Sequence, residues 1–343
     1  MVDELSTSVK GRKVWRRLRW ILIAAFFLAF ACCLYFLSSP RVQSRWRQSD
    51  RGDLTVFTEK NAPRAVASAF LKAFPDEGLA WMRGIGLDPG PTDKLSLVVF
   101  ASWHTYGAVS SSDQLIAPRF RNKPSSELRL MNSLAREFVL DEPVTSSYAL
   151  SDGSVLFINL DADYGSAAIH GLSHILARQR MPKALRDRSD IMNAGSYDAK
   201  TAAALSFADE TAALFLSDLR LSGVAGRKDG QGLGADALDA YEKYVASRYA
   251  PDGPLFRDED MRFAFAADQR GPEAFAASAR FAAGVARDRG LDALVSWAGK
   301  FLRGEYEDID GLFAPLSGSP QGGLPRLLAS YLGSSDILSG FYK

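Results

Sequence analysis

The chain has 343 residues and a formal net charge of +1 at pH 7; 47% of its residues are hydrophobic and 24% are charged. These proportions are those of an ordinary globular protein, long enough for one large domain or two average ones. The balanced charge, with no basic domain or recognisable nucleic-acid-binding module, argues against a nucleic-acid partner.

An uncharged apolar run extends from Trp20 to Leu37. It meets the lower length bound for a transmembrane helix, and six Lys and Arg residues precede it. The positive-inside rule then places residues 1–19 in the cytoplasm and the C-terminal domain outside it, in the periplasm or the extracellular space. A cleaved signal peptide is the alternative, but the run is long and ends in bulky residues, which favours an uncleaved membrane anchor over 20–37.

Both cysteines, Cys32 and Cys33, lie inside this apolar run. The part of the chain beyond the anchor therefore has no thiol. Disulfides, thiolate catalysis and cysteine-ligated zinc are excluded there.

After the anchor, the polar and basic residues 38–60 predict a juxtamembrane linker. Residues 62–81 show helical periodicity that is interrupted at Pro75. A β-branched and aromatic run over 94–102 predicts a strand, and 132–140 predicts a further helix.

Two apolar runs between residues 146 and 161 flank the sequence Ser-Asp-Gly-Ser at 151–154, which is typical of a β-hairpin. The second run leads into a helix that is predicted over 166–179. Pro182 closes this helix.

The rest of the chain has helical patterns. A strong amphipathic helix is predicted over 202–221, and a Gly-rich loop follows over 223–236. Three more helices are predicted, at 237–248, 272–289 and 292–303. The order predicts an α+β domain over 61–343, with a small sheet in the part up to about residue 180 and a helical part from about 200 to 343.

Two of the chain's three histidines, His170 and His174, are four residues apart in "AIHGLSH". On a helix, residues i and i+4 share a face, so both imidazoles can point at one metal ion. The alternative is an amphipathic helix whose two histidines merely lie together. Random placement of three histidines gives such a pair in roughly 2% of cases, so the spacing alone leaves both a metal site and a coincidental pair open.

The segments "AAIHGLSHILARQRMP" (167–182) and "FADETAALF" (207–215) resemble the metal-binding helices of gluzincin, or peptidase-MA-like, metallopeptidases. Those enzymes carry His-Glu-x-x-His on one helix and a third ligand, Glu, on the next. The resemblance continues through 277–316 and, in all, covers about 94–316. It implies a zincin-like α+β fold with a small twisted sheet and a helical C-terminal half. It also implies a zinc ion held by His170, His174 and Glu210.

Two departures from the family pattern bear on the chemistry. Gly171 occupies the position of the family's Glu, the general base that activates the metal-bound water. Residues 175–209 make the interval between His174 and Glu210 longer than is usual in the family, so an insertion loops out.

The resulting hypothesis is a membrane-anchored pseudoenzyme: a degenerate metallopeptidase that binds a peptide or partner protein in its cleft and has little or no proteolytic activity. Two alternatives stay open. One is an active zinc metallopeptidase with a substitute base, and the other is a metal-free structural or assembly protein.

Other candidate sites are weaker. His104 is interpreted as a loop or surface histidine, and Ser173 as a small helical residue because the G-x-S-x-G pattern is absent. The sequence "GQGLGAD" at 230–236 does not follow a strand, so it predicts a linker and not a nucleotide loop. The acidic run 258–260 lacks EF-hand spacing, and the phenylalanines of 263–281 are predicted to lie in the core.

Overall fold

The computed structural model describes residues 46–100, 147–149, 155–159, 164–189, 193–224, 233–250, 271–317 and 323–333, apart from single positions within these ranges, together with Trp20, Ile23, Phe26 and Leu338. The chain divides into two compact units. One comprises residues 1–46 and 112–122 and lies almost wholly outside the described residues. The other, residues 47–111 and 123–343, carries the sheet and helices that follow.

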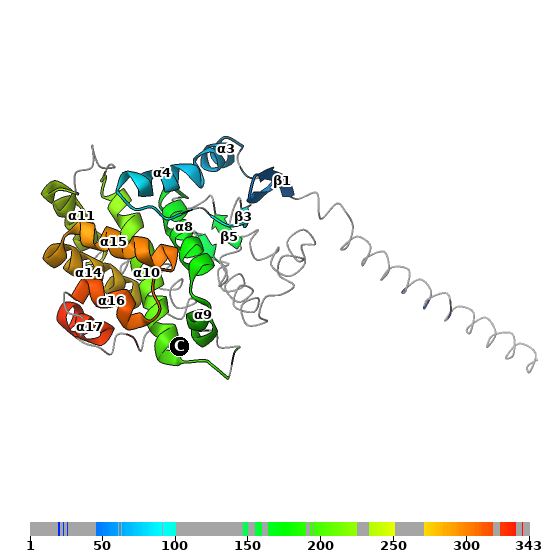
Figure 1. Cartoon of the computed structure of the whole chain (residues 1–343). Coiled ribbons are helices and arrows are strands. Elements are labelled where there is room, and N and C mark those ends of the chain that lie inside the picture. Colours follow the sequence, from blue (N-terminus) through cyan, green and yellow to red (C-terminus); the bar gives the residue numbers. More distant parts are fainter. Residues whose placement is uncertain are drawn as a thin grey trace, which may run out of the picture. The chain divides into compact units, whose positions relative to one another are not determined.

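A five-stranded sheet has the strand order β1-β2-β3-β5-β4. Its strands are β1 (Trp46–Arg51), β2 (Leu54–Glu59), β3 (Leu95–Phe100), β4 (Ser147–Ala149) and β5 (Val155–Asn159). Figure 1 labels its strands β1, β3 and β5. Strand β3 runs parallel to both β2 and β5, whereas β4 pairs antiparallel with β5. The predicted strand over 94–102 and the antiparallel pairing predicted within 146–161 are therefore confirmed.

Strands β1 and β2 occupy part of the stretch that the sequence predicts as a linker over 38–60. Strand β2 has the sequence Leu-Thr-Val-Phe-Thr-Glu, which is rich in β-branched and aromatic residues, so this stretch carried a strand signal that the predicted linker did not take into account. In the structure Leu54, Val56 and Phe57 are buried, and β2 pairs in parallel with β3.

Helices α3 (Arg64–Ala73) and α4 (Asp76–Gly84) are separated at Pro75, as the sequence predicts. Helix α4 approaches α8 (Tyr164–Arg180) closely at Gly78. A Cβ on Gly78 would lie 3.1 Å from Cδ2 of Leu172 and 3.2 Å from Cδ1 of Ile169. The absence of a side chain at residue 78 therefore lets α4 pack directly on the helix that carries the histidine pair.

Helix α8 confirms the helix predicted over 166–179 and joins the sheet to the helical part of the protein. Residues 169–177 of α8 are buried apart from His170, so this part of the helix is covered on nearly every side. The helix contacts β4 and β5, and it also contacts α10 and α15 (Figure 1). His170 and His174 therefore lie on a helix that packs against both the sheet and the helices α10 and α15.

Helix α10 (Ala199–Leu221) confirms the helix predicted over 202–221 and is buried on nearly all sides. A helix that is buried all round lies at the centre of a helical bundle. It packs against α8 and also against α9 (Lys183–Ser189), α11 (Ala235–Arg248), α14 (Gly271–Arg289), α15 (Leu291–Arg303) and α16 (Ile309–Ser317), whereas α17 (Leu324–Leu332) packs on α14 and α16. Three of these, α11, α14 and α15, confirm predicted helices, whereas α9, α16 and α17 are not predicted.

An aromatic cluster fixes α10 against the C-terminal helices. The ring of Phe207 lies 5.2 Å from that of Phe281 and 6.4 Å from that of Phe313, measured between centroids, and all three are fully buried. Trp297 lies 5.6 Å from Phe313. Such rings contribute stability beyond their buried area, so this cluster holds the segment that precedes Glu210 in place.

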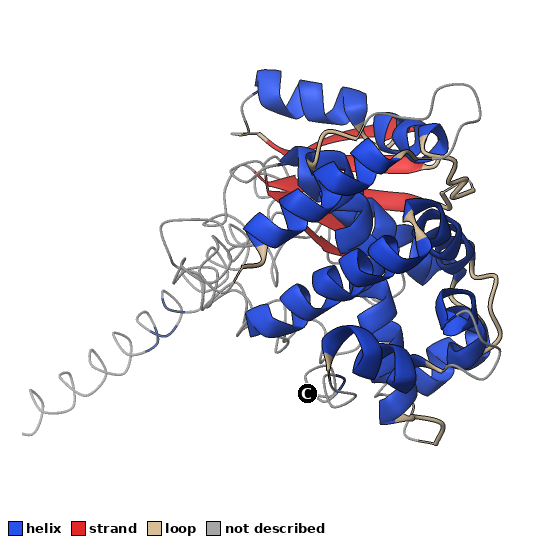
Figure 2. Cartoon of the chain, turned by 90° about the vertical axis from the view of Figure 1, so that its left-hand side faces the viewer, coloured by secondary structure: helices blue, strands red, loops and turns tan. Residues whose placement is uncertain are grey.

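The predicted α+β, zincin-like fold class is wrong. The described residues are mostly helical, and the sheet is small, with strands of three to six residues against helices of up to 23 (Figure 2). The strand signals of the sequence are real, but helices occupy almost all of the described chain after residue 164. Among the described residues no helix is both long and apolar enough to cross a membrane. The predicted anchor over 20–37 lies outside them except for three isolated positions, and so does the helix predicted over 132–140.

Candidate metal centre

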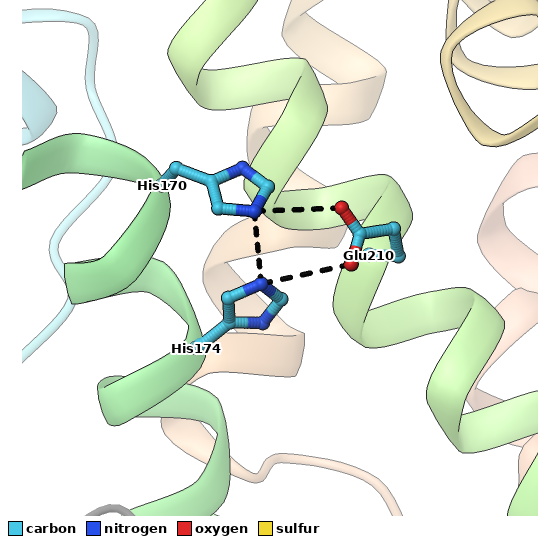
Figure 3. Close-up of side chains that lie close together, drawn as sticks. All are labelled: His170, His174 and Glu210. Carbon is cyan, nitrogen blue, oxygen red and sulfur yellow. Dashed lines mark hydrogen bonds and ion pairs between the residues drawn. The ribbon is translucent and has the colours of Figure 1, made fainter. Parts of the chain in front are cut away.

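The two histidines of α8 point the same way. Their ring centroids are 4.6 Å apart with the planes nearly perpendicular, and the two Nε2 atoms are 3.1 Å apart. This is the arrangement that the i,i+4 spacing predicts. Both imidazoles therefore present Nε2 to one point in space (Figure 3).

Glu210 reaches the same point from α10 (Figure 3). Its Oε1 lies 3.4 Å from Nε2 of His170, and its Oε2 lies 3.7 Å from Nε2 of His174. Glu210 is only 2% exposed, and His174 is 7% exposed. A carboxylate held this deeply needs compensation by cations or donors, and two imidazole nitrogens face it.

The separations fit a single metal ion. Four ligands placed tetrahedrally at about 2.0–2.1 Å from an ion are about 3.3–3.4 Å from one another. The three separations given above scatter around that value, and one ligand atom from each residue lies within 4.8 Å of the others. The group of His170, His174 and Glu210 could therefore hold a metal ion, and within the described chain it has no fourth His, Cys, Asp or Glu.

Asp209 contacts the opposite side of the His174 ring. Its Oδ1 lies 2.8 Å from Nδ1 of His174. A carboxylate at Nδ1 favours the tautomer that carries its proton there. Nε2, the nitrogen that faces Glu210, then keeps its lone pair for a metal ion.

Arg178 completes this set of contacts. Its Nε and Nη2 atoms donate to Oδ2 of Asp209 at 3.1 and 3.0 Å. From the sequence, Asp209 was rejected as a substitute base because its side chain leaves the helix about 100° from that of Glu210, and Arg178 was given no role. A signal was present, because Arg178 is one helical turn after His174 and Asp209 directly precedes Glu210. Whether Arg178 and Asp209 meet depends on the angle at which α8 and α10 cross, which the sequence does not show.

The remaining predicted sites fall into two groups. Ser173 is buried, and its hydroxyl donates to the carbonyl oxygen of Ile169 at 2.8 Å, as expected of a small helical residue. Phe281 is fully buried, as predicted for the core. His104 and the acidic run 258–260 lie outside the described residues.

A second buried polar group lies farther along α10. Asp218 is 1% exposed, and the hydroxyl of Tyr249 donates to its Oδ2 at 2.9 Å. Burial raises the pKa of Asp218 from its ordinary value to about 7, against the opposing effects of Arg248 and the Tyr249 hydrogen bond. Asp218 lies on α10, its partner Tyr249 directly follows α11, and neither belongs to the candidate metal site.

No family model, no curated protein and no solved structure matches this chain.

Proposed function

We propose that this protein binds a zinc ion at His170, His174 and Glu210, and that it is a metallopeptidase-like protein with little or no proteolytic activity. The observation that carries the proposal is the convergence of two imidazole nitrogens and a buried carboxylate at the spacing of a tetrahedral site. The resemblance of residues 167–182 and 207–215 to gluzincin helices rests on the same three residues and agrees with this geometry.

Zinc is favoured over other cations because of the donor set. Imidazole nitrogen suits zinc better than it suits magnesium or calcium, which prefer oxygen ligands. Three protein ligands leave one position for water or a bound molecule, which is typical of catalytic and not of structural zinc sites. The side chain of His170 is 20% exposed, against 2% for Glu210, so we expect the open position to be reached from the side of His170.

We attribute weak or absent proteolysis to the lack of a carboxylate in the position of the general base. Gly171 has no side chain where the resemblance places the general base, and a general base typically contributes about 10²–10⁴-fold to the rate. Asp209 is not a substitute, because it faces Nδ1 of His174, on the far side of the ring from the proposed metal position. We therefore propose that the open metal position binds a carbonyl or carboxylate oxygen of a peptide or partner protein without cleaving it.

The test is metal analysis of the purified full-length protein. Wild type is expected to contain zinc close to one equivalent after dialysis, and His170→Ala and Glu210→Ala are expected to lose it. The matched control is Glu242→Ala, which removes a half-buried glutamate of α11 that pairs with Arg287, away from the site. A metal-free wild type that is also unaffected in stability by His170→Ala would favour the structural alternative.

Membrane anchoring through residues 20–37 stays a prediction of the sequence. It is tested by fractionation of cells that express the full chain, with and without residues 1–37. Full-length protein in the detergent-soluble fraction and truncated protein in the aqueous fraction would support it. An aqueous full-length protein would contradict it.

A further inference from the structure

We propose that Arg178 is a positioning residue of the metal centre, acting on His174 through Asp209. The contacts form one continuous path. The guanidinium of Arg178 holds Oδ2 of Asp209 at 3.0–3.1 Å, and Oδ1 of the same carboxylate lies 2.8 Å from Nδ1 of His174. The inference rests on the proposed zinc site and adds to it a residue outside the ligand set.

The path follows from where the four residues stand on two helices. His174 and Arg178 are one turn apart on α8, so their side chains leave the same face. Asp209 and Glu210 are neighbours on α10, so their side chains leave it about 100° apart. Glu210 reaches Nε2 of His174, and Asp209 passes to its Nδ1. Helix α8 thus contributes two proposed ligands and the supporting Arg178, and α10 contributes the third ligand and the supporting Asp209.

Because the three side chains that form this path are largely buried, the contact between Arg178 and Asp209 has a defined geometry. The side chains of Arg178, Asp209 and His174 are 16%, 8% and 9% exposed. In such surroundings an Arg–carboxylate pair with two N–H donors holds its geometry, whereas a single lysine nitrogen would act as a point charge. Arg178 therefore fixes where the Asp209 carboxylate stands, and that position selects the His174 tautomer with its lone pair on Nε2.

The geometry also keeps Asp209 away from the metal position. Both of its oxygens are directed elsewhere, one toward Arg178 and one toward Nδ1 of His174. Without the guanidinium, the carboxylate would be free to rotate, and the imidazole would lose its fixed orientation. The expected consequence is a site that still has its three ligands but binds metal more weakly and with altered geometry.

The experiment is a zinc titration of the full-length protein in competition with a chromophoric chelator, together with the absorption spectrum of the Co²⁺-loaded form. Arg178→Gln is expected to weaken zinc binding by about 10–100-fold and to change the Co²⁺ spectrum. Arg178→Lys is expected to give an intermediate affinity. The matched control is Arg180→Gln, which removes an arginine of the same helix that pairs with Asp93 at the surface. It should bind zinc as wild type does.

The outcomes separate this inference from the proposed function. If wild type binds no metal, the zinc proposal itself fails. If wild type binds zinc, His170→Ala does not, and Arg178→Gln binds it with unchanged affinity and Co²⁺ spectrum, the zinc site stands and the role of Arg178 is overturned. Should Arg178→Gln fail to fold, Arg178→Lys decides in the same way, because it keeps the buried charge and loses only the two-nitrogen geometry.

Discussion

The carbonyl oxygen of Arg180, at the end of α8, occupies the space that a Cβ on Gly304 would need. Gly304 ends α15 in the left-handed region, with φ of 68°. The C-terminus of the histidine-bearing helix and that of α15 therefore meet at a residue without a side chain. This contact fixes one end of α8, six residues beyond His174.

Gly304→Ala should be strongly destabilising for two reasons. The left-handed conformation costs a non-glycine residue about 1–2 kcal/mol, and overpacking against a backbone atom adds about 1–3 kcal/mol. The matched control is Gly333→Ala at the end of α17, which has φ of 73° but open space around the added Cβ. Gly333→Ala should therefore be destabilised only by the cost of the left-handed conformation. Denaturant unfolding measures both, and equal losses would show that the contact with Arg180 is not restrictive.

A pH-dependent stability is expected from Asp218. Burial raises its pKa in the folded protein to about 7, with a smaller contribution of the same sign from Glu210. The folded state thus binds the proton more tightly than the unfolded state, whose carboxyl has its ordinary pKa near 3.8. The stabilisation is fully present below about pH 4 and is lost as the pH rises to about 7.

Asp218→Asn should remove this dependence, because an amide does not titrate and its oxygen can still accept from Tyr249. The free energy of unfolding, measured from pH 4 to pH 8 in both proteins, gives the comparison. The wild-type curve should fall toward neutral pH relative to that of the variant. Parallel curves would mean that Asp218 titrates at its ordinary pKa.

Two buried tyrosines near Asp218 should respond differently to loss of the hydroxyl. Tyr249 donates to Asp218, whereas the hydroxyl of Tyr241 has no hydrogen-bond partner among the described residues. Tyr249→Phe should cost about 1–3 kcal/mol, because it leaves a buried carboxylate without its donor. Tyr241→Phe should be nearly neutral or slightly stabilising. Chemical unfolding at pH 8, where the carboxylate is charged, tests the contrast, and an equal cost for the two would refute it.

The start of α10 depends on Asp198. Its side chain accepts from the backbone N–H of Lys200, the hydroxyl of Thr201 and the guanidinium of Arg188, and these bonds lower its pKa to about 2. Asp198→Ala should therefore cost about 1 kcal/mol at neutral pH. Because the folded pKa is lowered, wild type loses this advantage as the pH falls from about 4 toward 2. Asp239→Ala, which breaks an exposed pair with Lys243, is the control and should change little.

Local sequence patterns were sufficient to predict the two helices that carry the candidate metal ligands. The spacing of apolar residues predicts both α8 and α10, and the resemblance to gluzincins names Glu210, which the structure brings to the two histidines. The overall class was not predictable in the same way. Short strands give strong signals, whereas the share of helix depends on segments such as α16, which carries Pro315 within it.

The pairing of Arg178 with Asp209 could not be predicted from the sequence for a similar reason. Arg178 and Asp209 are 31 residues apart, and each looks like an ordinary charged residue of an amphipathic helix. Their pairing depends on how α8 and α10 cross, which side-chain packing decides and a single sequence does not show. The burial of Asp218 likewise depends on α11, which covers it through Tyr249.

Gly171 stands where the gluzincin pattern has its general base. Gly171→Glu restores the acid of the His-Glu-x-x-His pattern beside the proposed zinc ion. If the missing base is what limits proteolysis, zinc-loaded Gly171→Glu should cleave peptides faster than wild type by about 10²–10⁴-fold, and a chelator should abolish the gain. Gly171→Gln is the matched control, since it has the same size and no basic oxygen.

Burial of Gly171 in α8 makes the comparison informative, because both variants must accommodate a long side chain at the same place. Thermal unfolding and zinc content are therefore measured for each before activity. A folded, zinc-loaded Gly171→Glu without activity would show that the surroundings of the metal exclude a substrate peptide. Chelator-sensitive cleavage by wild type at a rate similar to that of the Glu variant would instead overturn the assignment of Gly171 as the cause of low activity, because another group would then have to supply the base.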